Sequence, residues 1–118
     1  AYEIASCLVG SEMCIRDRLI NKPQGGFYLL PEFINKKFST STELCDNILK
    51  ETGVALLPGS DFGFSEKKML ARLSYTDFDG ENFMNNTVHN EEIDYEKIKK
   101  YAPKIIEGTN RLKDWSNN

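Results

Sequence analysis

The segment ETGVALLPGSDFGFSEKKMLARLSYT, residues 51–76, combines two strand patterns with a turn-rich connection between them. Residues 54–57 are all apolar, which is typical of a short buried strand, and Pro58 and Gly59 end that strand. Residues 71–76 alternate apolar and polar side chains, as a strand does when one face is buried and the other is open. The segment therefore predicts two strands of one small sheet.

Arg72 lies on the polar side of the second strand, together with Ser74 and Thr76. A guanidinium on a rigid strand presents a planar fork of N–H donors, from which a carboxylate can accept two parallel hydrogen bonds. An exposed sheet face that carries an arginine and no ligand would show the same pattern. Arg72 is therefore a candidate for carboxylate binding, with a plain surface residue as the alternative.

The chain before this segment predicts another strand and a helix. Residues 27–30 have the composition of a strand, and Pro31 ends it. Thr40 and Glu43 have the spacing of a capping box, which predicts a helix beginning there, and Gly53 is typical of the left-handed cap at its end. Four residues are expected on the buried stripe of this helix: Leu44, Cys45, Ile48 and Leu49.

The last quarter of the chain has a helical pattern from Ile93 onward. Pro103 must bend or break this helix because it lacks a backbone N–H, and two short helices that meet near Ala102 fit equally well. The apolar positions are Ile98, Tyr101, Ile105, Leu112 and Trp115. The whole pattern predicts an α+β fold, a small, mostly antiparallel sheet with helices packed on one face.

With 118 residues, a net charge of −3 and 40% hydrophobic residues, the chain has the composition of one small globular domain. The acidic balance argues against nucleic acid or an anionic membrane surface as a partner, and no apolar run reaches the length of a membrane span. Cys7, Cys14 and Cys45 are an odd set without CxxC spacing, which argues against a disulfide scaffold or zinc site and favours a reducing cytoplasm.

The first 18 residues form a separate segment. Arg16 and Arg18 follow the apolar stretch instead of preceding it, so the segment does not have the pattern of a secretory signal. Residues 8–18 resemble the peptide that results when a sequencing adapter is translated within an open reading frame. We therefore expect residues 1–18 to be non-native and residues 19–118 to form the domain; a genuine short N-terminal helix is the alternative.

The sequence offers few groups for chemistry of its own. His89, the single histidine, lies in a polar stretch without a second His or Cys and is expected in a solvated loop. Asp77 and Asp79 resemble the start of a calcium loop, but the further ligands do not fall at the required spacing, so a turn is expected. No Gly-rich phosphate loop, nucleophile elbow or Ser/His/Asp set occurs. No metal site is therefore predicted.

Three blocks of sequence carry a family resemblance. QGGFYLLP at residues 24–31, ETGVALLPGSDFG at residues 51–63 and ARLSY at residues 71–75 resemble the C-terminal small domain of class I/II, fold type I, pyridoxal-phosphate-dependent aminotransferases. YAPK at residues 101–104 and RLKDW at residues 111–115 resemble the closing helix of that domain. The blocks have the order and spacing of the family, and the resemblance spans about four-fifths of the chain.

The resemblance implies roles for four residues. Arg72, in the Arg-Leu-Ser block, would hold the α-carboxylate of the substrate. Phe62 would line or close the site, and Gly26 and Phe27 would lie where the first small-domain strand approaches the cofactor pocket. For Phe27, Tyr28 and Phe62, packing in the core is an equally good interpretation.

The resemblance also implies what this chain lacks. In the family, the Schiff-base lysine, the acidic partner of the pyridine nitrogen and the phosphate cup belong to the larger N-terminal domain, and no lysine here lies in a recognisable Schiff-base motif. No catalytic residue is therefore predicted. The chain would be a fragment of a homodimeric parent that binds pyridoxal 5'-phosphate, an amino acid and a 2-oxo acid, and would be inactive alone.

Two other interpretations remain open at this point. The parent could be a pyridoxal-phosphate-dependent lyase or synthase of the same fold, because these enzymes also bind an α-carboxylate. Alternatively, the chain could be a free-standing, non-catalytic small-molecule or interaction module with a ferredoxin-like sheet.

Overall fold

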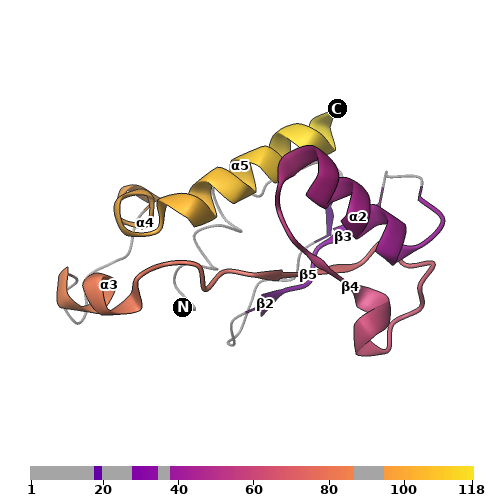
Figure 1. The fold of residues 1–118 in the computed structure, drawn as a ribbon, viewed down its shortest axis with the longest axis horizontal. Helices are drawn as coiled ribbons and strands as arrows, with labels where there is room; N and C mark the ends of the chain where they lie inside the picture. The colour runs from indigo at the N-terminus through magenta and orange to yellow at the C-terminus, as the bar shows by residue number, and fades with distance from the viewer. Residues whose placement is uncertain (1–17, 20–27, 35–37, 87–94) are drawn as a thin grey trace.

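The computed structural model describes residues 18–19, 28–34, 38–86 and 95–118. Their α+β arrangement confirms the predicted fold class (Figure 1). The elements in chain order are β1 (Arg18–Leu19), β2 (Tyr28–Leu29), β3 (Glu32–Phe33), α2 (Ser41–Thr52), β4 (Leu57–Pro58), the 3₁₀ helix η2 (Gly59–Phe62), β5 (Ala71–Ser74), α3 (Gly80–Asn86), α4 (Tyr95–Tyr101) and α5 (Pro103–Asn117).

The main sheet has the strand order β2-β5-β4, and both pairings are antiparallel. The register places Tyr28 of β2 opposite Ser74, and Leu57 of β4 opposite Arg72. A separate antiparallel pair joins β1 to β3. The strand β5 is therefore the middle strand, held on both sides.

One predicted strand is displaced along the chain. Residues 54–57 were expected to form it, but the pairing of β4 with β5 begins only at Leu57 and includes Pro58. The Val54 N–H donates to Thr52 Oγ1 at 3.1 Å, so the chain is still tied to the end of α2 at this point. Pro58 is tolerated because β4 is an edge strand, where a missing N–H breaks no further ladder.

The helix α2 begins and ends as predicted. The Thr40 hydroxyl accepts a hydrogen bond from the Glu43 N–H at 3.2 Å, and Gly53 closes the helix in the left-handed conformation with φ 74°. Leu44, Cys45 and Ile48 are buried as expected. Leu49 is not, because the buried stripe continues to Thr52 instead and leaves Leu49 at its exposed edge.

The C-terminal region forms two helices, α4 and α5, which meet at Ala102; of the two alternatives left by the sequence, the structure has the second. Pro103 is the first residue of α5, a position where its missing N–H has no partner in the helix to lose. Four of the five predicted apolar positions are buried, and the fifth, Tyr101, is half-buried and packs against the core.

The helix α3 was missed by the sequence pattern, which predicted only a turn. Asp79 accepts a hydrogen bond from the Asn82 N–H at 3.0 Å and so caps the helix. Phe83 is buried and meets the rings of Phe78 and Tyr101 edge-on, with centroids 5.7 and 6.0 Å away. A helix of seven residues, about two turns, with a single buried side chain leaves no periodic pattern to detect.

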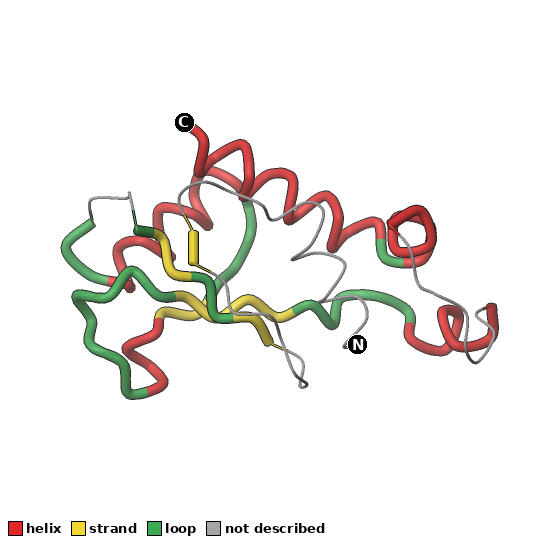
Figure 2. Tube along the Cα trace, turned by 180° about the vertical axis from the view of Figure 1, so that it is seen from behind, coloured by secondary structure: helices red, strands yellow, loops and turns green. Residues whose placement is uncertain are grey.

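The helices α2 and α5 lie along one side of the main sheet (Figures 1 and 2). Along β5, Ala71, Leu73 and the following Tyr75 are buried in the core that these helices share. Arg72 and Ser74 alternate with them and therefore point to the opposite face, which we call the arginine face. Among the described residues, no helix has the length and apolar character that a membrane span requires.

Candidate functional site

Arg72 occupies the centre of the arginine face. Its backbone belongs to the middle strand, paired with β4 on one side and β2 on the other. A residue on a middle strand has little backbone freedom, because hydrogen bonds hold the strand from both sides. The side chain of Arg72 therefore starts from a fixed point, and its half-buried body leads outward to the surface.

Two aromatic rings hold the guanidinium of Arg72. Its Cζ atom lies 4.2 Å from the ring centroid of Tyr28 and 4.1 Å from that of Phe62. Tyr28 comes from β2 and Phe62 from η2, which follows β4, so the rings approach from the two sides of β5. Cation–π attraction favours this stacked arrangement. Because the N–H groups lie in the guanidinium plane, rings over its faces leave the donors free at the edge.

The donors of Arg72 are not used by the described part of the chain. No described residue accepts a hydrogen bond from this guanidinium or pairs with it as an acid. Tyr28, Leu57 and Phe62 surround it with apolar surface, and each is 40 to 48% exposed. Apolar surroundings strengthen the attraction between a cation and an incoming anion, since they lower the local dielectric constant. The arrangement can therefore bind a carboxylate edge-on.

A tight turn fixes the position of Phe62. The Gly59 N–H donates to the Leu70 oxygen at 2.7 Å, and a Cβ atom at Gly59 would lie 3.0 Å from that same oxygen. Gly63 ends η2 with φ 86°, a conformation that other residues rarely adopt. The turn formed by residues 58–63 thus folds back on β5 and places the ring of Phe62 against the guanidinium of Arg72.

The structure brings together two of the four residues singled out from the sequence. Arg72 and Phe62 are in contact, whereas Gly26 and Phe27 lie outside the described residues, as does His89. Tyr28 is an addition to the site. The buried Leu29 beside it indicates that Tyr28 points to the other face, but its pairing with Ser74 could not be read from local sequence.

The titratable groups with shifted pKa values belong to the covered side of the sheet. Burial raises the pKa of the Cys45 thiol to about 11, and the carboxylates of Asp46 and Asp61 act in the same direction. Burial also raises the pKa of Tyr75. A thiol with a raised pKa is a poor nucleophile. Within the described ranges, no group of three or more His, Cys, Asp or Glu residues could hold a metal ion.

Comparison with known proteins shows a relationship to an aminotransferase. The chain is 36% identical over 59 residues to an aspartate aminotransferase of Sulfolobus acidocaldarius. The match covers 48% of this chain and 15% of that protein, so the chain corresponds to a small part of its relative. No protein-family model matches the chain, and no solved structure matches it.

Proposed function

We propose that this chain is part of a pyridoxal-phosphate-dependent aminotransferase, in which Arg72 binds the α-carboxylate of the substrates. The observation that carries this proposal is the guanidinium between Tyr28 and Phe62, whose N–H donors no described residue uses. The similarity to an aspartate aminotransferase supports the reaction class.

The geometry suits both substrates of an amino-group transfer. An amino acid and a 2-oxo acid share a planar carboxylate next to the reacting carbon, so one arginine can serve both directions of the reaction. Two parallel charge-assisted hydrogen bonds would fix the plane of the carboxylate as well as its distance. Arg72 would thereby orient the neighbouring carbon, and it is a binding residue with no proton to transfer.

The described residues do not fit the cofactor itself. Every lysine in the described ranges is exposed or half-buried, whereas a Schiff-base lysine requires an enclosed pocket with partners for the ring nitrogen and phosphate. We therefore assign cofactor binding to another part of the parent protein and derive no step through it. Residues 19–118 would be the small domain of a homodimeric enzyme, and the segment of residues 1–18 would be foreign to it.

The proposal is tested by titrating the chain with pyruvate, the simplest 2-oxo acid, while following the Nε–Hε NMR signal of Arg72. We expect saturable shifts of this signal and of the backbone amide signal of Ser74, which lies on the same face of β5. The Ser74 shift should be lost in Arg72→Met, whose own side chain has no Nε–Hε group. Methyl pyruvate, which lacks the carboxylate, should leave the signal in place. Pyruvate shifts that avoid Arg72, or that persist in the Arg72→Met variant, would contradict the proposal. The purified chain should show no transamination, since it lacks a fitting cofactor lysine among its described residues.

A further inference from the structure

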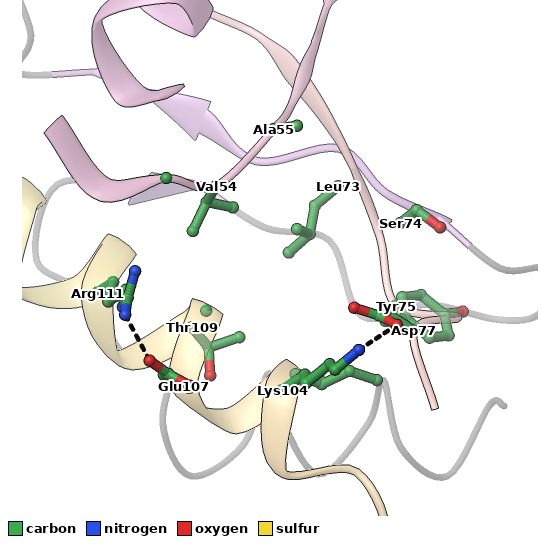
Figure 3. Close-up of a pocket in the computed structure, with 13 residues that line it drawn as sticks. Val54, Ala55, Leu73, Ser74, Tyr75, Asp77, Lys104, Glu107, Thr109 and Arg111 are labelled. Atoms are coloured by element: carbon green, nitrogen blue, oxygen red, sulfur yellow. Dashed lines mark hydrogen bonds and ion pairs between the residues drawn. The ribbon is translucent and has the colours of Figure 1, made fainter. Parts of the chain in front are cut away.

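A cavity of about 490 Å³ opens on the covered side of the sheet (Figure 3). It lies between the segment after α2, the end of β5 and one side of α5. Leu73 lines it and alternates with Arg72 along β5, so the cavity and the arginine site are on opposite faces. Its volume falls within the range of small-molecule sites.

Apolar side chains form part of the lining of the cavity, together with Ser74 and Thr109. The side chains of Val54 and Leu73 point toward α5 in Figure 3, and Ile105 of α5 contributes from the opposite wall. Gly108 lies in the middle of α5 and has no side chain to enter the cavity. A Cβ atom at this position would lie 3.8 Å from Val54 and would take up part of the space between them. Glycine is an unfavourable residue inside a helix, and here its absence of a side chain leaves room for a small apolar group.

Two ion pairs lie at the cavity, and they differ in how firmly their side chains are held by the rest of the chain. Arg111 is engaged by the chain itself, since it donates to the Thr52 oxygen at 3.0 Å and to Glu107. The other pair is open: Lys104 Nζ lies 3.6 Å from Asp77 Oδ1, and about three-quarters of each side chain is exposed. An exposed pair of this kind contributes little to stability, so a ligand can separate it at small cost.

We propose that this cavity binds a free α-amino acid with an apolar side chain. The ligand carboxylate would accept hydrogen bonds from Lys104, its ammonium would donate to Asp77, and its side chain would pack against the apolar wall. A zwitterionic head with an apolar body matches one cation and one anion beside an apolar hollow. The proposal goes beyond the proposed function, because it uses neither Arg72 nor the arginine face.

The test is an NMR titration of the full chain and of its Arg72→Met variant with L-leucine, following Ile105 and Gly108 of α5. We expect saturable shifts in both proteins with Kd values within about twofold, because the two sites share no binding group. Lys104→Met and Asp77→Asn should each raise the Kd at least about tenfold, since each removes a charge-assisted hydrogen bond. Both side chains are exposed, so the fold is expected to persist.

Ligand analogues and one further variant complete the test. Leucinol lacks the carboxylate and 4-methylpentanoate lacks the ammonium, so each should bind at least about tenfold more weakly than leucine. Gly108→Ala should weaken leucine binding while it stabilises α5, which separates loss of room from loss of fold. The proposal is overturned if no saturable shift occurs, if Arg72→Met abolishes all binding, or if leucinol binds as well as leucine.

Discussion

The two faces of the main sheet use β5 in opposite ways. On the covered face, Leu73 and Tyr75 are buried in the core beneath the helices. On the arginine face, Arg72 extends between two partly exposed rings and retains donors that no described residue uses. Alternation along a single strand thus separates the residues that hold the fold from the residue that we propose binds a carboxylate.

A comparison of two arginines gives the same contrast at the level of single groups. Arg111 donates to the Thr52 oxygen and to Glu107, so it ties α5 to the end of α2. Arg72 has the same five donors but is held through its flat faces by Tyr28 and Phe62. The two arginines differ in what the N–H donors of their guanidinium groups contact. Those of Arg111 bond to other parts of the chain, whereas those of Arg72 are available to a ligand.

The largest effect is expected from a pair of neighbouring substitutions on β5. Leu73→Ala removes a buried side chain and should lower the free energy of unfolding by about 3 kcal/mol. Ser74→Ala, one residue along and exposed, should change it by about 0.5 kcal/mol or less. Urea denaturation of the two variants measures the difference. Equal losses would mean that the two faces contribute alike, which contradicts the separation described above.

The second prediction compares the loss of each arginine in a separate variant. Arg72→Met should abolish the pyruvate-dependent NMR shifts, a loss of roughly 100-fold in affinity, because two charge-assisted hydrogen bonds are removed. Its stability should change little. Arg111→Met should keep pyruvate binding and lower the free energy of unfolding by about 1 kcal/mol, since Thr52 loses a donor to its oxygen. Each variant is the control for the other, measured by titration and denaturation together.

The third prediction uses pH to probe the covered face. The pKa of Cys45 is about 11 in the folded chain and 9.0 for an ordinary thiol. As pH rises above 9, the unfolded chain loses this proton first, so stability is full below pH 9 and falls toward pH 11. We expect the free energy of unfolding to fall by roughly 1 to 2 kcal/mol across this interval. In Cys45→Ala the decrease should be smaller; an unchanged pH profile would contradict the assignment.

The smallest effect is expected at the rings. Phe62→Leu keeps an apolar side chain but removes one cation–π contact of about 0.7 kcal/mol, so pyruvate affinity should fall roughly threefold. Rotation of the guanidinium about its Nε–Cζ bond should become faster, which NMR exchange at the Nη hydrogens reports. Phe62→Tyr should restore both values. If rotation is the same in all three proteins, the rings do not hold Arg72.

Local sequence was sufficient where a single residue determines the backbone. Thr40 began α2, Gly53 ended it, and Pro103 divided α4 from α5, because each of these residues permits few conformations. The alternation in residues 71–76 placed Arg72 on the open face. These outcomes depend on neighbours within a few positions, which a sequence pattern records directly.

The features that escaped prediction depend on contacts between distant residues. Tyr28 reaches Arg72 only through the pairing of β2 with β5, which lie more than forty positions apart in the chain. The start of β4 depends on where the chain leaves α2, and Leu49 is exposed because the buried stripe of α2 continues to Thr52 instead. These features are determined by tertiary packing, and a local sequence pattern carries no information about contacts between distant residues.

Pro58 has a consequence for how the sheet ends. It lies in β4, the outer strand on one side, and supplies no N–H to any chain that might align there. Open sheet edges are templates on which proteins add strands and aggregate. The strand β4 has only two residues, and one of them is a proline. A strand from another molecule would therefore find almost no backbone hydrogen-bonding groups to pair with at this edge. The molecule thereby protects itself from edge-to-edge polymerisation at the strand beside Arg72.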